Sequence, residues 1–177
     1  LLVGPAEPTS SVSAVKKAAS AVAAQAGRVD GVGIANVRGG KALRAADAAL
    51  RGAGLRPVAC AVDLSLVDNG AIGDGTLAAA KDLGLTVLAR SPLYAGLSSG
   101  DITAQNPTGG ARFGVTPKFR FRALNELAPL HGAIEQVASM VEARRADDER
   151  SAAASAGREP PKTRPEKVLP TQVALQW

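Results

Sequence analysis

The chain has 177 residues, of which 46% are hydrophobic and only 3% aromatic, and its formal net charge is +5. This apolar content excludes a disordered chain and suffices for the core of one domain. The scarcity of aromatic residues favours helices packed on a sheet over an all-β sandwich. The single cysteine, Cys60, excludes an internal disulfide and lies in an apolar run. We therefore expect a buried thiol in a reducing compartment, cytoplasmic or, alternatively, within an organelle.

The positive charge lies in runs of mixed sign, such as residues 142–150. Because no basic stripe alternates with aromatic residues, we expect no nucleic-acid partner, whereas a positive pocket for phosphate groups agrees with the charge. No apolar stretch approaches the ~18 residues of a membrane span, so we expect no membrane partner. One cysteine and one histidine make no metal site. The chain opens on Leu1 without a signal-like start, so we expect an internal piece of a longer protein.

Helix and strand patterns alternate along the first half of the chain. Apolar residues at helical spacing predict a helix that begins at Ser10 or Ser11 and ends at Gly27. The following segments are, in order, a strand at 29–37, a helix at 41–53, a strand at 57–62, a helix at 76–83 and a strand at 85–89. Gly54-Leu55 and Gly84-Leu85 end the second and third helices. This alternation predicts the α/β class with parallel βα units.

Residues 86–97 form the most informative block, an apolar strand that reaches a proline and then a loop of small residues. The continuous run at 87–89 predicts a strand buried on both faces. Ligands of parallel α/β proteins bind at the carboxyl ends of strands. We therefore expect Ser91, Leu93 and Gly96 to line a site, the alternative being an ordinary exit from strand to loop.

The second half of the chain is less regular. Residues 98–118 are rich in glycine, proline and polar side chains, which predicts a long loop on the face that carries the site. A helix is predicted at 123–145, with a possible break at Pro129. Residues 146–167 combine charge with low complexity, so we expect a flexible insertion there. The last residues, 169–177, look like the start of a helix.

Four segments carry a resemblance to a known family. Residues 33–37 (Gly-Ile-Ala-Asn-Val) are similar to a Gly-Val-Ser-Asn-Phe strand end, and residues 62–68 to a segment that reads Val-Glu-Tyr-Ser-Leu. Residues 89–97 resemble Ala-Tyr-Ser-Pro-Leu-x-x-Gly-Leu, and residues 170–177 a helix with Thr-x-x-Gln-Val-Ala-Leu-x-Trp. In this order and spacing they resemble the C-terminal half of the aldo-keto reductase family.

The resemblance implies a (β/α)8 TIM barrel, here a partial barrel that covers residues 1–177. It also implies an NADPH-dependent enzyme that reduces a small aldehyde or ketone to an alcohol. The family's catalytic Asp, Tyr, Lys and His lie on earlier strands, so this chain would be a fragment that holds the cofactor half without catalytic residues. The lone His131 matches none of them, and we expect it to be structural or exposed.

The positions that match the family's cofactor contacts can be named one by one. Asn36 would hold the nicotinamide carboxamide of NADP, an amide-to-amide role that its donor and acceptor suit. Ser91 and Leu93 would meet the pyrophosphate, Arg112 a cofactor phosphate, and Arg90 stands where the family has an aromatic that stacks on the nicotinamide. The alternatives are a turn-forming Asn36 at a strand end and a solvated loop arginine at 112.

Three positions depart from the family pattern. A serine is replaced by Ala35, a carboxamide-binding glutamine by Ala61 and the stacking aromatic by Arg90. Alanine side chains form no hydrogen bonds, and arginine stacks only as a flat cation. These losses favour a second hypothesis, a non-catalytic cofactor-binding or regulatory barrel. For the fold, a doubly wound domain is the alternative.

Overall fold

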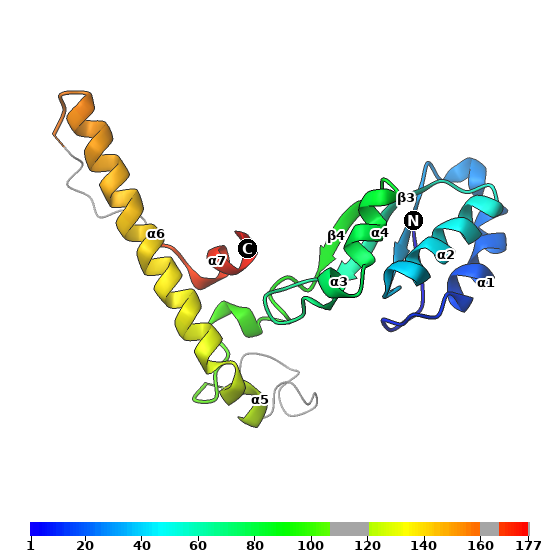
Figure 1. Cartoon of the computed structure of the whole chain (residues 1–177), viewed down its shortest axis with the longest axis horizontal. Helices are drawn as coiled ribbons and strands as arrows, with labels where there is room; N and C mark the ends of the chain where they lie inside the picture. Colours follow the sequence, from blue (N-terminus) through cyan, green and yellow to red (C-terminus); the bar gives the residue numbers. More distant parts are fainter. Residues whose placement is uncertain (107–120, 160–166, 177) are drawn as a thin grey trace. The chain divides into compact units, whose positions relative to one another are not determined.

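The computed structural model describes residues 1–106, 121–159 and 167–176 (Figure 1). The chain divides into two compact units, Leu1–Pro92 and Leu93–Trp177, and each is described by itself. Arg112 lies outside the described residues, as does part of the predicted loop at 98–118. None of the described helices combines the length and the apolar character that crossing a membrane requires.

The N-terminal unit is built on a parallel sheet of four strands. The strands are β1 (Leu2–Val3), β2 (Val32–Ala35), β3 (Pro57–Asp63) and β4 (Thr86–Arg90). Their spatial order, β1-β2-β3-β4, follows the chain without a reversal, and every neighbouring pair is parallel. The predicted α/β class and parallel pairing are therefore confirmed for this unit. The two residues of β1 were not predicted, because so short a strand has no readable periodicity.

Helices cover one face of this sheet. They are α1 (Ser13–Ala23), α2 (Gly40–Gly52) and α4 (Thr76–Asp82), with the single turns η1 (Ala26–Arg28) and α3 (Gly70–Gly73) between them. Ile34 and Cys60 of the sheet pack in one core with Val15, Leu43 and Leu50 of the helices. The three longer helices lie where they were predicted, except that α1 ends at Ala23 and the 3-10 turn η1, not the helix, includes Gly27. Cys60 is buried as expected. The predicted strand at 29–37 is shorter, because only Val32–Ala35 pair with the neighbouring strands.

Two glycines end α2 and α4 as their sequence predicts. Gly54 has φ +76° and Gly84 has φ +67°, a left-handed conformation that glycine adopts at little cost. In each case the next residue donates its backbone N–H five residues back, Leu55 to Leu50 at 3.0 Å and Leu85 to Ala80 at 2.9 Å. This Schellman arrangement turns the chain sharply and places the leucine in the core before the next strand.

The prediction that β4 is buried on both faces is wrong. Val87 is 37% exposed and Leu88 is 43% exposed. The reason is that β4 is the edge strand of the described sheet and pairs only with β3. A short apolar run has the same pattern whether or not a strand lies on its other side, so the sequence alone did not reveal the edge.

The C-terminal unit is helical where it is described. It contains η2 (Leu97–Ser99), α5 (Phe121–Glu126), α6 (Ala128–Ser155) and α7 (Pro170–Gln176). Leu97, Ile102 and Leu124 form a small core. His131 is buried beside it, with Nε2 2.6 Å from the carbonyl oxygen of Leu97. Since a carbonyl only accepts, Nε2 carries the proton of this bond, which agrees with the structural reading of His131.

Two expectations for this unit need correction. The predicted helix at 123–145 is divided at Leu127, and Pro129 lies in the first turn of α6, where proline is well tolerated. Helix α6 then continues to Ser155, so residues 146–155 of the expected flexible insertion are helical. Alanine and arginine favour the helix there without a core to pack on. Part of the predicted loop is also ordered, because Leu97–Ser99 form a 3-10 turn.

Candidate functional site

The carboxyl ends of three neighbouring strands carry polar side chains. Asn36 follows β2, Asp63 ends β3, and Arg90 ends β4. The strand register pairs Asp63 directly with Arg90, and the backbone N–H of Asn36 donates to the carbonyl of Ala61 at 3.3 Å. Because the strands are parallel, these side chains meet at one edge of the sheet. Together with Arg38 and Asp68, they are called the carboxyl-edge cluster.

The Asn36 side chain forms three hydrogen bonds with other residues of the chain. Its Nδ2 donates to the carbonyl oxygens of Pro5 at 2.9 Å and Ala6 at 3.1 Å, and its Oδ1 accepts from Arg90. The backbone has φ +58°, a conformation that asparagine tolerates better than most residues. Asn36 therefore fills the turn-forming role at the end of β2, and both of its amide hydrogens are in use.

Arg90 joins two strand ends through one guanidinium. One terminal nitrogen donates to Asn36 Oδ1, and the other lies 3.2 Å from Asp63 Oδ1. The Arg90 side chain is 40% exposed and that of Asp63 is 18% exposed. A pair this accessible to solvent contributes only about 0–1 kcal/mol to stability. Its main effect is on orientation, because two acceptors hold the guanidinium at the edge of the sheet.

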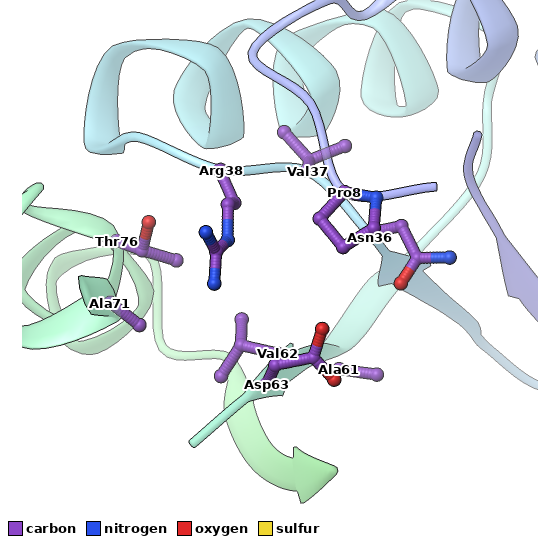
Figure 2. Close-up of a pocket in the computed structure, with 9 residues that line it drawn as sticks. All are labelled: Pro8, Asn36, Val37, Arg38, Ala61, Val62, Asp63, Ala71 and Thr76. Carbon is purple, nitrogen blue, oxygen red and sulfur yellow. The ribbon is translucent and has the colours of Figure 1, made fainter. Parts of the chain in front are cut away.

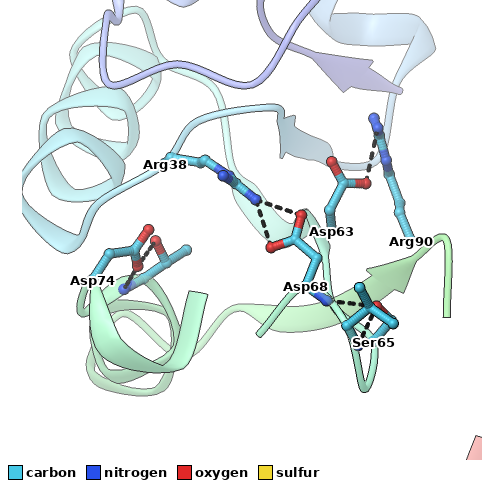
Figure 3. A network of polar contacts seen from close by, with 8 residues as sticks. Arg38, Asp63, Ser65, Asp68, Asp74 and Arg90 are labelled. Atoms are coloured by element: carbon cyan, nitrogen blue, oxygen red, sulfur yellow. Dashed lines mark hydrogen bonds and ion pairs between the residues drawn. The ribbon is translucent and has the colours of Figure 1, made fainter. Parts of the chain in front are cut away.

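A second ion pair lies in the same cluster and was not predicted. Arg38, two residues after Asn36, donates one terminal nitrogen to both carboxylate oxygens of Asp68, at 2.9 and 2.8 Å (Figure 3). Ser65 Oγ accepts from the N–H of Asp68 at 2.9 Å and so holds the turn that carries this aspartate. The sequence does contain a signal for this ion pair: Arg38 and Asp68 have opposite charges, and each follows one of two neighbouring strands within a few residues.

The starts of α2 and α4 are joined beside the cluster. Asp74 Oδ1 accepts from both the N–H and the hydroxyl of Thr76, at 2.8 and 2.6 Å, and Thr76 Oγ1 accepts from Gly39 N at 2.8 Å. Gly40 N donates to the Asp74 carbonyl at 3.1 Å. A Cβ on Gly40 would lie only 2.5 Å from the Gly75 carbonyl oxygen. The two helices therefore approach through their backbones, which explains the glycines there.

A small pocket opens between the strand ends and the helix starts (Figure 2). Its free volume is about 10 Å³, which is room for about one water molecule and much less than a nicotinamide ring requires. The walls are formed by Pro8, Asn36, Val37, Arg38, Ala61, Val62, Asp63, Ala71 and Thr76. The small side chains of Ala61 and Ala71 thus leave no cavity large enough for a ring.

The other predicted cofactor residues differ in their surroundings. Ser91 is exposed directly after β4 and has φ +50°. Such a conformation in a non-glycine residue is sparsely populated and is often found where a ligand binds. Leu93 belongs to the C-terminal unit, where its carbonyl accepts from Gly96 N and Ser98 N, both at 3.0 Å. The structure therefore places Asn36, Arg90 and Ser91 in the N-terminal unit and Leu93 in the other.

The charges of the carboxyl-edge cluster cancel. Two arginines face two aspartates, so the cluster offers no excess positive charge to a phosphate. Both aspartates are paired with an arginine, and the described residues contain no group of three or more potential metal ligands. As it stands, the cluster is suited to holding strand ends together and presenting a guanidinium, and it contains no residue set up as a nucleophile.

Comparison with protein-family models and with curated protein sequences gives no match for this chain. The features that bear on its function are therefore the carboxyl-edge cluster and the four segments that resemble the aldo-keto reductases.

Proposed function

We propose that this chain is the cofactor-side part of an aldo-keto reductase-like oxidoreductase that uses NADPH to reduce an aldehyde or a ketone to an alcohol. The catalytic Asp, Tyr, Lys and His would come from chain outside these 177 residues. The partial (β/α)8 barrel is supported by the sequential strand order and by helices that pack on one face of the sheet. A doubly wound sheet reverses its strand order and carries helices on both faces.

The observation that carries this proposal is the meeting of Asn36, Arg90 and Ser91 at the carboxyl edge of parallel strands. This edge is where barrel enzymes bind ligands. The left-handed backbone of both Asn36 and Ser91 adds support, because strain of this kind collects at binding sites.

The fit of the described residues to NADP is uneven. When bound, the cofactor would supply the hydride. The exposed hydroxyl of Ser91 suits a phosphate oxygen, and an asparagine suits a carboxamide by its donors and acceptor. A nicotinamide carboxamide does not fit at Asn36 while Pro5, Ala6 and Arg90 hold this side chain, and the pocket beside it is too small for the ring.

The same bonds favour a second candidate, a non-catalytic cofactor-binding or regulatory barrel. Asn36 is engaged by the chain itself, and the ion pairs of the carboxyl-edge cluster leave no free charge. A protein selected only for binding or regulation would retain the fold and tolerate these changes at the edge.

Calorimetric titration of the 177-residue chain with NADPH, followed by an aldehyde reductase assay, tests the first candidate. We expect binding without turnover, since a positioned acid typically contributes about 10²–10⁴-fold to rate and the proposal puts that acid in chain outside these 177 residues. Ser91→Ala should weaken binding, while Ser10→Ala, a change at another exposed serine, should not. Absence of NADPH binding contradicts both candidates, and robust turnover contradicts the placement of the acid outside this chain.

A further inference from the structure

We propose that residues 93–98 form a two-state turn, which is strained in the closed form that the structure shows and is held in that form by a hydrogen bond from His131. The turn belongs to the C-terminal unit, and its role does not depend on the proposed cofactor site. Three features point to a second, open form: the backbone conformation of the turn, a buried hydroxyl without a partner, and the small number of contacts that hold the turn closed.

The backbone of the turn is left-handed at three successive residues. Tyr94, Ala95 and Gly96 have φ values of +50°, +58° and +90°. The carbonyl of Leu93 closes the turn, because it accepts from the N–H groups of Gly96 and Ser98, both at 3.0 Å. Glycine adopts this conformation at little cost, but a residue with a Cβ is disfavoured in it by about fivefold or more. Such residues keep a left-handed backbone only where their surroundings impose it, as in switch regions.

The hydroxyl of Ser98 adds to the cost of the closed form. Ser98 is fully buried, and its Oγ has no hydrogen-bond partner among the described residues. A buried hydroxyl of this kind has lost its bonds to water without replacement. Opening of the turn returns this hydroxyl to water and frees the carbonyl of Leu93 at the same time. The open form therefore gains solvation that the closed form lacks.

The core that holds the turn is small. Leu97 is buried with Ile102 and Leu124, and Tyr94 and Ala95 pack against these three residues. The core of the N-terminal unit, in contrast, joins residues from four strands and three long helices. Regions with few buried apolar contacts open at a lower free energy than the rest of a protein. The strain of the turn is therefore opposed by only a few apolar contacts.

Two side-chain hydrogen bonds complete the closed form. His131 Nε2 donates to the carbonyl of Leu97 at 2.6 Å, and Ser99 Oγ donates to the carbonyl of Gly96 at 2.7 Å. Ser99 directly follows the turn, whereas His131 is buried on α6, 34 residues away in the sequence. A bond from a separate helix fixes the turn against the core. His131 is therefore the positioning residue that holds the turn closed.

Native-state hydrogen exchange of the 177-residue chain, followed by NMR, measures opening at the amides of Gly96 and Ser98. Ala95→Gly removes the strain of one Cβ and should slow exchange at both amides about fivefold. Ala104→Gly is the control, because Ala104 also packs against the small core but has no positive φ, and it should not slow exchange. Unchanged or faster exchange in Ala95→Gly would show that the closed turn is not strained, which overturns the proposal.

Two variants of His131 test its holding role. His131→Leu removes the donor and should accelerate exchange at Gly96 and Ser98 roughly tenfold, whereas His131→Gln retains an N–H donor and should restore part of the protection. The amides of Ile134 and Ala138, buried on α6, report unfolding of the whole unit and should be affected less. Equal acceleration at all four amides would show that His131 only stabilises the unit. That result, or no acceleration at the turn, overturns its holding role.

Discussion

Helices α2 and α6 are both rich in alanine, but they are stabilised in different ways. Five of the 13 residues of α2 are buried, spread from Ala42 to Leu50. Only His131, Ile134 and Ala138 are buried among the 28 residues of α6, and all lie in its first half. Helix α2 is therefore held by packing on the sheet, whereas the second half of α6 depends on intrinsic helix propensity. Mutations should affect the two helices very differently.

The largest difference is expected from truncating a leucine of α2. Leu50 is fully buried, so Leu50→Ala removes apolar contacts and leaves a cavity. The free energy of unfolding should fall by about 2–5 kcal/mol, measured by urea denaturation. Met140→Ala on α6 is the control, because Met140 is 70% exposed, and it should change stability by less than about 0.5 kcal/mol. Similar losses in both variants would mean that α6 is packed as tightly as α2.

A methyl group at the start of α2 should also destabilise the N-terminal unit. In Gly40→Ala the Cβ would lie 2.5 Å from the Gly75 carbonyl oxygen, so the two helices must separate. We expect a loss of about 1–3 kcal/mol in the free energy of unfolding. Gly52→Ala at the other end of α2 meets nothing within 4 Å and should be neutral or stabilising. If both variants unfold at the same urea concentration, α2 and α4 do not approach each other as closely as the structure shows.

The free energy of unfolding should depend on pH in the alkaline range, because the core beneath α2 contains the thiol of Cys60. Burial raises the pKa of the Cys60 thiol. Above about pH 8.5 the unfolded chain loses this proton while the folded chain retains it, so the free energy of unfolding falls with rising pH. The slope approaches about 1.4 kcal/mol per pH unit at most. Urea titrations at several pH values measure it, and Cys60→Ala should lack this part of the slope. An equal slope in both proteins would show that Cys60 is not the source.

The smallest effect is expected at Gly132 of α6, where a methyl group would meet no neighbouring atom and mainly helix propensity would change. Gly132 lies inside the helix and a Cβ there meets nothing within 4 Å. Gly132→Ala should therefore raise the free energy of unfolding by about 0.5–1 kcal/mol. The reverse change at the next, exposed position, Ala133→Gly, should lower it by a similar amount. Thermal denaturation followed by circular dichroism compares the two, and a loss of stability in both would indicate an unexpected contact at Gly132.

The sequence by itself determined the order and type of the elements in the N-terminal unit. Apolar periodicity placed α1, α2 and α4, and the pairs Gly54-Leu55 and Gly84-Leu85 marked two helix ends. These features are local, because a helix repeat or a left-handed glycine is encoded within a few residues. The sequence also indicated that Asn36, Arg90 and Ser91 follow strands, which requires only the position of each strand end.

Only the tertiary structure decided which groups these residues contact. Asn36 binds Pro5 and Ala6, about 30 positions earlier, and Arg90, 54 positions later. The exposure of Val87 and Leu88 likewise depends on whether another strand lies beside β4. Hydrogen-bond partners and exposure follow from strand register and sheet order, which are set by packing between distant segments. A local pattern can therefore predict that a residue lies at the edge of the sheet, but not whether its polar atoms are already in use.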